Sequence, residues 1–233
     1  MTFCDTQRVN HHDFDLHYPN GIIVPVEVTM SANQAHVETV IAIQHGGSLV
    51  PRKLCAHDWQ VHPHIGANIG RVRRFIDEYL ADVEAAGFET FFTYFHAWSH
   101  TSIDRMKSIG VEGGSITKLK VAGIQITYPS DGGTIGPPCL VEAVNGEAAK
   151  SDNRSKLGRS TAPERHLFVY VDGLNFRPWA SLLEFDLTAE PPTLPDEITD
   201  VWAVASGFPK RYEVWRGNRS GWRSFGAVTV EYE

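Results

Sequence analysis

Cysteine is scarce in this sequence: Cys4, Cys55 and Cys139 are the three among 233 residues, far apart and without a CxxC pair. This odd, scattered set predicts no disulfide framework. No run of about 18 apolar residues occurs, so we expect no membrane span and no membrane partner. The N-terminal "MTFCDTQRVNHH" lacks the basic start and apolar block of a signal peptide. We therefore expect a reduced, cytoplasmic protein.

Positive charge is also in deficit, since 21 Lys and Arg against 28 Asp and Glu give a net charge of −7. This disfavours a chain that is basic overall for binding nucleic acid. Residues 1–50, however, hold five acidic side chains against one arginine, and residues 209–224 hold five basic ones against one glutamate. The basic stretch is interleaved with aromatic residues, so we expect Arg216 and Arg219 in it to contact nucleic acid.

Motifs of nucleotide binding and of serine hydrolases are missing. The glycine-rich "HGGS" and "GGTIGPP" match neither GxxxxGK[ST] nor GxGxxG, and no GxSxG occurs. These stretches are therefore interpreted as ordinary loops.

Strand and helix patterns alternate along the chain. Residues 69–86 show the spacing of a buried helical stripe, with Asn68 as the cap and Gly87 as the stop. Alternation in 13–18 and 22–29 predicts two strands, and the apolar "RHLFVYVD" is typical of a sheet centre. We expect a mixed α/β (α+β) fold with a central mixed sheet, flanking helices and a C-terminal β-hairpin turning near Gly217-Asn218.

Acidic residues stand inside a hairpin pattern at 11–29, "HHDFDLHYPNGIIVPVEVT". Its even positions are mostly apolar and its odd positions mostly polar, so each strand has one face of each kind. A three-residue loop at 19–21 suits Pro, Asn and Gly in a type I turn followed by a left-handed residue. It pairs Tyr18 with Ile22 and brings the two polar faces together.

This register places Asp13 opposite Glu27, with Asp15 as the diagonal neighbour. Opposed carboxylates repel each other, and a divalent cation relieves the repulsion; Mg²⁺ typically takes one or two carboxylates and keeps several waters. We expect Mg²⁺ or Mn²⁺ at Asp13, Asp15 and Glu27, with His11 on the same face as a further ligand. A solvated sheet face without a metal is the alternative.

An aspartate on one strand, a turn and "PVEVT" on the next resemble the signature of the PD-(D/E)XK nuclease superfamily. The chain also resembles uncharacterised actinobacterial proteins with "ALEVT" and "ERHLFVWVD" stretches. The nuclease resemblance implies an αβββαβ core and metal-dependent hydrolysis of phosphodiester bonds in nucleic acid. "SDNRSKLGRS" and "RHLFVYVD" would then be the last helix and strand of this core.

The resemblance also implies roles for individual residues. Asp13 or Asp15 would be the first acid and Glu27 the second, catalytic one. Thr29 occupies the place of the usual lysine ("EVT" for "ExK"), so Lys156 is expected to orient the attacking water in its stead. The nucleic acid backbone would be held by Lys150, Arg154 and Arg159.

We expect a single domain over 1–233, with a nuclease-like core at 11–30 and 118–175, a helical insertion at about 31–117 and a β extension at 190–233. The leading interpretation is a divalent-metal-dependent nuclease. Two alternatives stay open: an inactive interaction module that kept the nuclease fold, and a His/carboxylate metalloprotein of unknown substrate.

Overall fold

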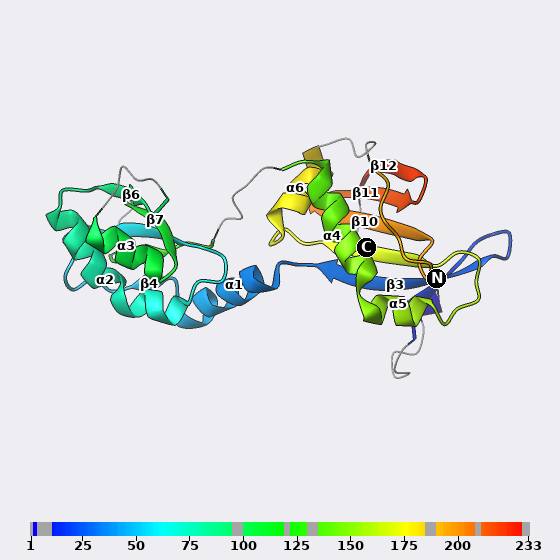
Figure 1. Ribbon diagram of the computed structural model, residues 1–233, viewed down its shortest axis with the longest axis horizontal. Coiled ribbons are helices and arrows are strands. Elements are labelled where there is room, and N and C mark those ends of the chain that lie inside the picture. Colours follow the sequence, from blue (N-terminus) through cyan, green and yellow to red (C-terminus); the bar gives the residue numbers. More distant parts are fainter. Residues whose placement is uncertain are drawn as a thin grey trace. The chain divides into compact units, whose positions relative to one another are not determined.

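The computed structural model describes residues 2–3, 11–94, 100–118, 122–129, 135–184, 190–207 and 211–229. The fold divides into two compact units (Figure 1). The first combines Met1–Ala32 with Gly133–Glu233, and the second is Asn33–Gly132. Each unit contains helices and an open sheet, which confirms the predicted mixed α/β class.

A seven-stranded sheet forms the centre of the first unit, in the order β1-β2-β3-β9-β10-β11-β12. Strands β3, β9 and β10 run parallel to one another, and the other neighbours are antiparallel. The apolar β9 lies between two parallel partners, as predicted for a sheet centre. The bounds are β1 Thr2–Phe3, β2 Phe14–His17, β3 Ile23–Ser31, β9 His166–Val171, β10 Asp200–Gly207, β11 Arg211–Asn218 and β12 Gly221–Thr229.

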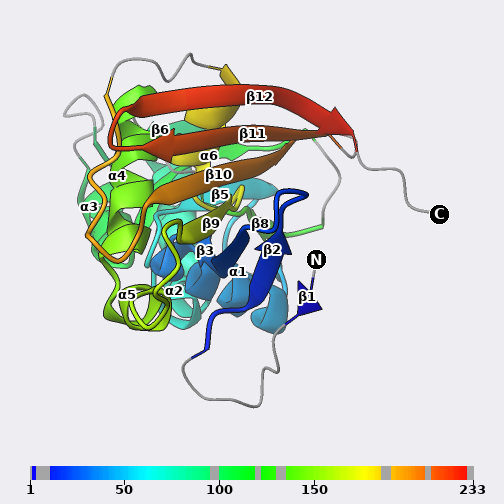
Figure 2. The same cartoon turned by 90° about the vertical axis from the view of Figure 1, so that its right-hand side faces the viewer.

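Helices α4 (Pro137–Ala149), α5 (Ser151–Leu157) and α6 (Phe176–Glu184) pack on this sheet. Figure 2 shows α4 and α5 on one side of the stacked strands. The first core lies between these helices and the sheet, and its members include Leu140, Leu157, Leu167, Leu182 and Trp215.

The β2–β3 hairpin has the predicted register. Phe14 pairs with Val26 and Leu16 with Val24. Tyr18 and Ile22 are joined by a backbone hydrogen bond of 2.9 Å across the three-residue loop. Gly21 has φ +82°, the left-handed conformation expected at the last loop position. This confirms that the polar faces of the two strands coincide.

The second unit holds a five-stranded sheet, in the order β4-β8-β5-β7-β6, and its own core. Its strands are β4 Leu49–Val50, β5 Trp59–Pro63, β6 Thr90–Phe92, β7 Val111–Ile116 and β8 Ile124–Ile126. Its helices are α1 Gln34–Gly46, α2 Ile69–Ala85 and α3 Thr101–Ser108. Helix α2 is capped by Asn68, as predicted, and buries its apolar stripe.

Two carboxylates on α2 hold the loop before β5. Asp77 accepts hydrogen bonds from the backbone N–H groups of residues 53–55. Glu84 accepts from the next two N–H groups and from the indole of Trp59 at 2.8 Å. These acids are therefore satisfied by structural bonds.

The structure differs from the expected layout in two places. The insertion, expected to be helical at about 31–117, is a unit with both helices and a sheet, and residues 118–132 belong to it. Its strands β4 and β8 have only two and three residues, too few for a periodic pattern. The C-terminal hairpin turns at Arg219-Ser220, two residues later than expected.

Within the ranges that the structure describes, no helix has the length and apolar character needed to cross a membrane.

The two cores predict separate effects of matched substitutions. Leu80→Ala on α2 and Leu140→Ala on α4 each remove a side chain with no exposed surface. Each should destabilise its own unit by about 3 kcal/mol through the lost contacts and the cavity. Hydrogen exchange should quicken in the unit that carries the substitution. Equal loss of protection in both units from either substitution would contradict this expectation.

Candidate functional site

Packing of α4 and α5 orients polar side chains toward β3. Leu140, Val144 and Ala148 form the buried stripe of α4. Glu147, next to this stripe, is buried as well. The Asn153 amide of α5 donates to the Glu147 carbonyl at 2.9 Å and fixes the junction of the two helices. The sheet face that carries Glu27 and Thr29 is thereby covered by the apolar stripes of the two helices, with polar side chains of α4 and α5 beside these stripes.

A buried ion pair joins β3 to α5. The Nζ of Lys156 lies 2.6 Å from Oε1 of Glu27, whose side chain is only 2% exposed. Asp152, one turn earlier on α5, lies 3.3 Å from the same ammonium group. The structure thus brings together the two residues that were expected to be catalytic.

Burial raises the pKa of the Glu27 carboxyl above its usual value. The hydrogen bond from Lys156 acts in the opposite direction, and the negative charge of Asp13 raises the pKa further. The hydrogen bond to Glu27 raises the pKa of Lys156, so this ammonium group stays protonated at neutral pH. Lys156 can therefore orient or stabilise a ligand, but it is unsuited to accept a proton.

The second oxygen of Glu27, Oε2, is buried and has no hydrogen-bond partner. Asp13 lies on the same side of the hairpin: its N–H bonds the carbonyl of Val26, and its Oδ2 accepts from the N–H of Val28 at 2.7 Å. A buried carboxylate oxygen without a partner is costly. A cation between Asp13 and Glu27 would satisfy it.

Thr29 joins a second polar group beside Glu27. Its hydroxyl donates to Oε2 of Glu147 at 2.8 Å, and Lys150 pairs with the same oxygen at 2.6 Å. Thr29 therefore holds a helix carboxylate at the position where the nuclease signature has lysine. Lys150 and Lys156 both reach carboxylates along this face of β3.

The other two residues that were expected to be metal ligands, Asp15 and His11, have contacts with His12. Asp15 is bound to Nε2 of His12 at 2.7 Å. His11 is exposed, and its ring lies against that of His12. Asp13, Asp15, Glu27 and His11 do not form a set of three ligand atoms within 4.8 Å of one another, because Asp15 turns to His12 and Asp13 to the backbone of β3.

The arginines expected to bind nucleic acid differ in their pairing with acidic side chains. Arg154 makes two hydrogen bonds to Glu197, and Arg219 pairs with Asp196 at 2.7 Å. Arg159 is exposed just beyond the end of α5. Arg216 belongs to a separate cluster.

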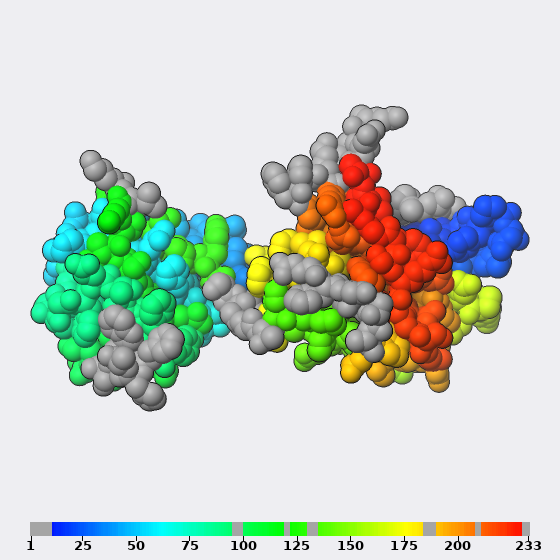
Figure 3. All heavy atoms as spheres, turned by 90° about the horizontal axis from the view of Figure 1, so that it is seen from above, coloured from blue at the N-terminus to red at the C-terminus, as the bar shows by residue number. Residues whose placement is uncertain are grey.

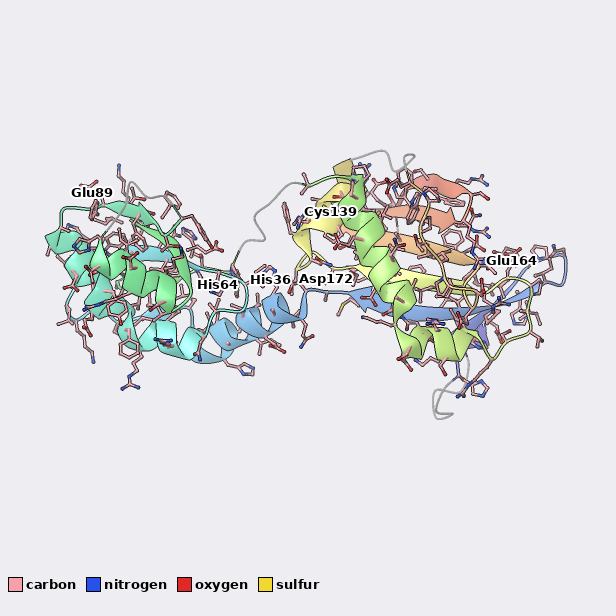
Figure 4. The ribbon with its side chains drawn as sticks, in the orientation of Figure 1. His36, His64, Glu89, Cys139, Glu164 and Asp172 are labelled. Atoms are coloured by element: carbon pink, nitrogen blue, oxygen red, sulfur yellow. The ribbon has the colours of Figure 1, made fainter. Side chains whose placement is uncertain are left out.

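That cluster comprises Glu164, His166 and Asp200, whose ligand atoms all lie within 4.8 Å of one another; among the described residues it is the group with this geometry. The three could hold a metal ion. Figure 4 shows Glu164 at one end of β9 and Asp172 at the other. Arg216 bonds both acids, Asp200 at 2.9 Å and Glu164 at 3.3 Å.

Hydrogen bonds already satisfy the buried members of this cluster. The indole of Trp202 donates to Nδ1 of His166 at 3.3 Å, which leaves the proton of the neutral ring on Nε2. Nε2 lies 3.1 Å from Glu164 and 3.4 Å from Asp200. Burial acts to raise the pKa of Asp200. Hydrogen bonds from His166 and Arg216 act in the opposite direction and hold this pKa below its usual range. A metal ion would have to displace the Nε2 proton.

Sequence reasoning missed Glu147 and the Glu164 cluster. Glu147 and Lys150 stand three apart, a spacing that signals a pair on one helix face. Glu164 and His166 stand two residues apart at the start of β9, so their side chains share a face. Asp200 carries no local signal, because the parallel pairing of β9 with β10 brings it there.

Lys156→Met tests the buried pair through stability. Without the ammonium group, Glu27 must be ionised without a partner or bind a proton, so the free energy of unfolding should fall by about 3 kcal/mol at pH 8. Because the folded-state pKa of Glu27 is raised, its burial is harmless below its unfolded pKa near 4.5 and unfavourable as pH rises through the folded value. Denaturation at pH 4 and pH 8 should show the loss growing with pH.

Arg154→Met is the matched control on the same helix. The side chain of its partner Glu197 is 30% exposed, against 2% for Glu27, so breaking that pair should change stability much less at both pH values. A Lys156→Met variant that loses equal stability at pH 4 and pH 8 would contradict the role assigned to Glu27.

Comparisons with protein-family models, curated proteins and solved structures find no match to this chain. No relative therefore assigns a role to any side chain in these clusters. The contacts of Glu27, Lys156 and Asp13 are the evidence from which a function has to be argued.

Proposed function

We propose that this chain is a divalent-metal-dependent phosphodiester hydrolase acting on nucleic acid, of the kind that the PD-(D/E)XK signature implies. One observation carries the proposal: Lys156 lies 2.6 Å from Glu27, and the other oxygen of Glu27 is buried without a partner. Glu27 could use this second oxygen to bind a metal ion. The neighbouring lysine would then be suited to orient a water bound to that ion. Asp13, across the hairpin, would be the first acid of the signature.

The arrangement of elements supports the same proposal. β1, β2 and β3 are consecutive antiparallel neighbours, α4 and α5 follow, and β9 pairs in parallel with β3. This order of elements is consistent with the βββαβ part of the core that the resemblance implies. Among the described residues no helix precedes β1, where the implied core has its first helix.

The proposed chemistry assigns a role to each group. Asp13 and Glu27 would hold Mg²⁺ or Mn²⁺, which lowers the pKa of a bound water and stabilises charge on the phosphoryl oxygens. Lys156, protonated at neutral pH, would orient the water through an N–H bond and offset charge on the phosphate. Lys150 is placed to contact the nucleic acid backbone once it leaves Glu147.

Cleavage assays test the proposal. The wild-type chain should cut DNA or RNA with Mg²⁺ or Mn²⁺ and should be inactive in EDTA. Glu27→Gln and Lys156→Met should each lower the rate by at least 100-fold, since both disturb the metal-bound water. Glu197→Gln, which changes a partly exposed acid paired with Arg154 of α5, should cut like the wild type.

Three outcomes divide the alternatives. Cleavage that survives Glu27→Gln at the wild-type rate would come from another site or a contaminant. Nucleic acid binding without cleavage would favour the inactive interaction module. Absence of both, with folded protein, would refute the proposal.

We also propose a second candidate function, a metal centre at Glu164, His166 and Asp200, because their ligand atoms lie within 4.8 Å of one another. One imidazole and two carboxylates suit Zn²⁺ or Mn²⁺. The hydrogen bond from Trp202 would be lost when His166 moves its proton from Nε2 to Nδ1. Because protons compete with the metal ion for the imidazole and the carboxylates, binding should weaken at low pH.

Thermal unfolding with Zn²⁺ tests this centre. The unfolding temperature should rise more at pH 8 than at pH 6, and Glu164→Gln should abolish the rise. Glu164 is the most exposed of the three, so its amide variant should fold normally. Glu197→Gln again serves as the control. A Zn²⁺ effect that is unchanged in Glu164→Gln would place the ion elsewhere.

A further inference from the structure

The seven-stranded sheet presents a second face with a different character. Glu27 and Thr29 of β3 point toward α5 and α4, so the alternate residues Val28 and Met30 point to the opposite face. Val28 is 41% exposed and Met30 53%. This surface, which we call the open face, is apolar at β3 and continues across β9 and β10 through Phe168 and Trp202.

Aromatic rings and arginines form a layer on the open face. The rings of Trp202 and Phe225 lie 5.2 Å apart. The guanidinium of Arg216 lies 5.5 Å from the Trp202 ring, and that of Arg223 lies 5.1 Å from the Phe225 ring. Arg216 is the strand partner of both Trp202 and Arg223, so these side chains share one face.

Two tryptophans of the basic stretch at 209–224 do not belong to this layer. Trp215 and Trp222 lie on the other face, against the core. Trp222 occupies the space beside Gly217, where any side chain would collide with its ring. Phe225 reaches the open face at a bulge, since Trp215 pairs with Ser224 and Val214 with Gly226.

The two arginines differ in their charge balance. Arg216 is neutralised by Asp200 and Glu164. Arg223 contacts Phe225, and no acid in the described ranges lies within 4.0 Å of it. Both line a cavity of about 370 Å³ together with Asn218, Ser220, Gly221 and Trp222. Arg223 is therefore the arginine of this cavity whose charge has no acidic partner in the described ranges.

We propose that the open face binds single-stranded nucleic acid, with a base on Phe225 and Trp202 and a phosphate at Arg223. An exposed ring beside a cation that has no acidic partner in the described ranges complements a ligand that carries a flat π-system and a negative charge close together. Phe225 is 44% exposed, so a base can reach it. Strands β11 and β12, orange to red in Figure 3, lie at the surface of their unit.

This surface is distinct from the proposed hydrolytic site. Glu27 and Phe225 lie on opposite faces of the sheet, and neither needs the other for its contacts. Binding at the open face therefore requires no metal ion. It goes beyond the hydrolase proposal and can hold or fail independently of it.

Fluorescence anisotropy with a labelled 12-nucleotide oligothymidylate, in EDTA and 50 mM NaCl, tests the inference. Phe225→Ala should weaken binding about tenfold through the loss of one stacked base. Arg223→Gln should also weaken it and lower the slope of log affinity against log salt by about one. Circular dichroism confirms that each variant is folded.

Two matched controls should bind like the wild type. Arg211→Gln removes an exposed arginine from the neighbouring strand β11, at the end away from the hairpin turn, where it pairs with Glu213. Tyr128→Ala removes an exposed aromatic ring from the inserted unit. Glu27→Gln should also bind normally, so that a failure of cleavage is distinguishable from a failure of binding.

Four results would overturn the inference. They are no binding by the wild type, equal binding by Phe225→Ala and Arg223→Gln, competition by thymidine monophosphate as strong as by the oligonucleotide, and a dimer that Phe225→Ala converts to a monomer. The third would mean a mononucleotide pocket, and the fourth an interface between two copies of the chain. Binding lost in both variants and kept in the controls supports it.

Discussion

The ammonium group of Lys156 allows a carboxylate to lie almost out of contact with water between β3 and α5. Glu27 is 2% exposed, and an isolated charge in such a place costs several kcal/mol. The pair therefore couples the ionisation of Glu27 to the position of α5. That position depends in turn on the Asn153 bond to the end of α4 and on the Leu157 side chain in the core. The packing of the helices and the ionisation of the site residues therefore depend on each other.

Alternation along the strands gives the sheet two chemically different surfaces. On the helix side, Glu27 and Thr29 face lysines and a buried glutamate, in a dry setting where charges act strongly on one another. On the open side, Trp202 and Phe225 stand beside arginines with more access to water. The two faces differ because successive side chains along a strand point to opposite sides of the sheet.

A whole folded unit separates the parts of the candidate site in the sequence. Glu27 and Lys156 are 129 residues apart, with Asn33–Gly132 between them. The inserted unit has its own core, built on Trp59, Phe91 and the buried stripe of α2. The first unit likewise has a core of its own.

Local features of this protein follow from the sequence alone. Pro19, Asn20 and Gly21 specify the three-residue loop, and the parity of the flanking residues sets the register, because turn geometry and side-chain alternation act over a few residues. The cap at Asn68 and the central strand β9 were predictable on the same ground.

Tertiary structure decided the rest. It chose Lys156 as the partner of Glu27, with Lys150 on Glu147, and it turned Asp15 to His12. It also gathered Glu164, His166 and Asp200 through the parallel pairing of β9 and β10. The sequence determined which side chains share a strand face. Which distant side chain meets that face depends on how helices and strands pack over the whole unit, and no local pattern encodes it.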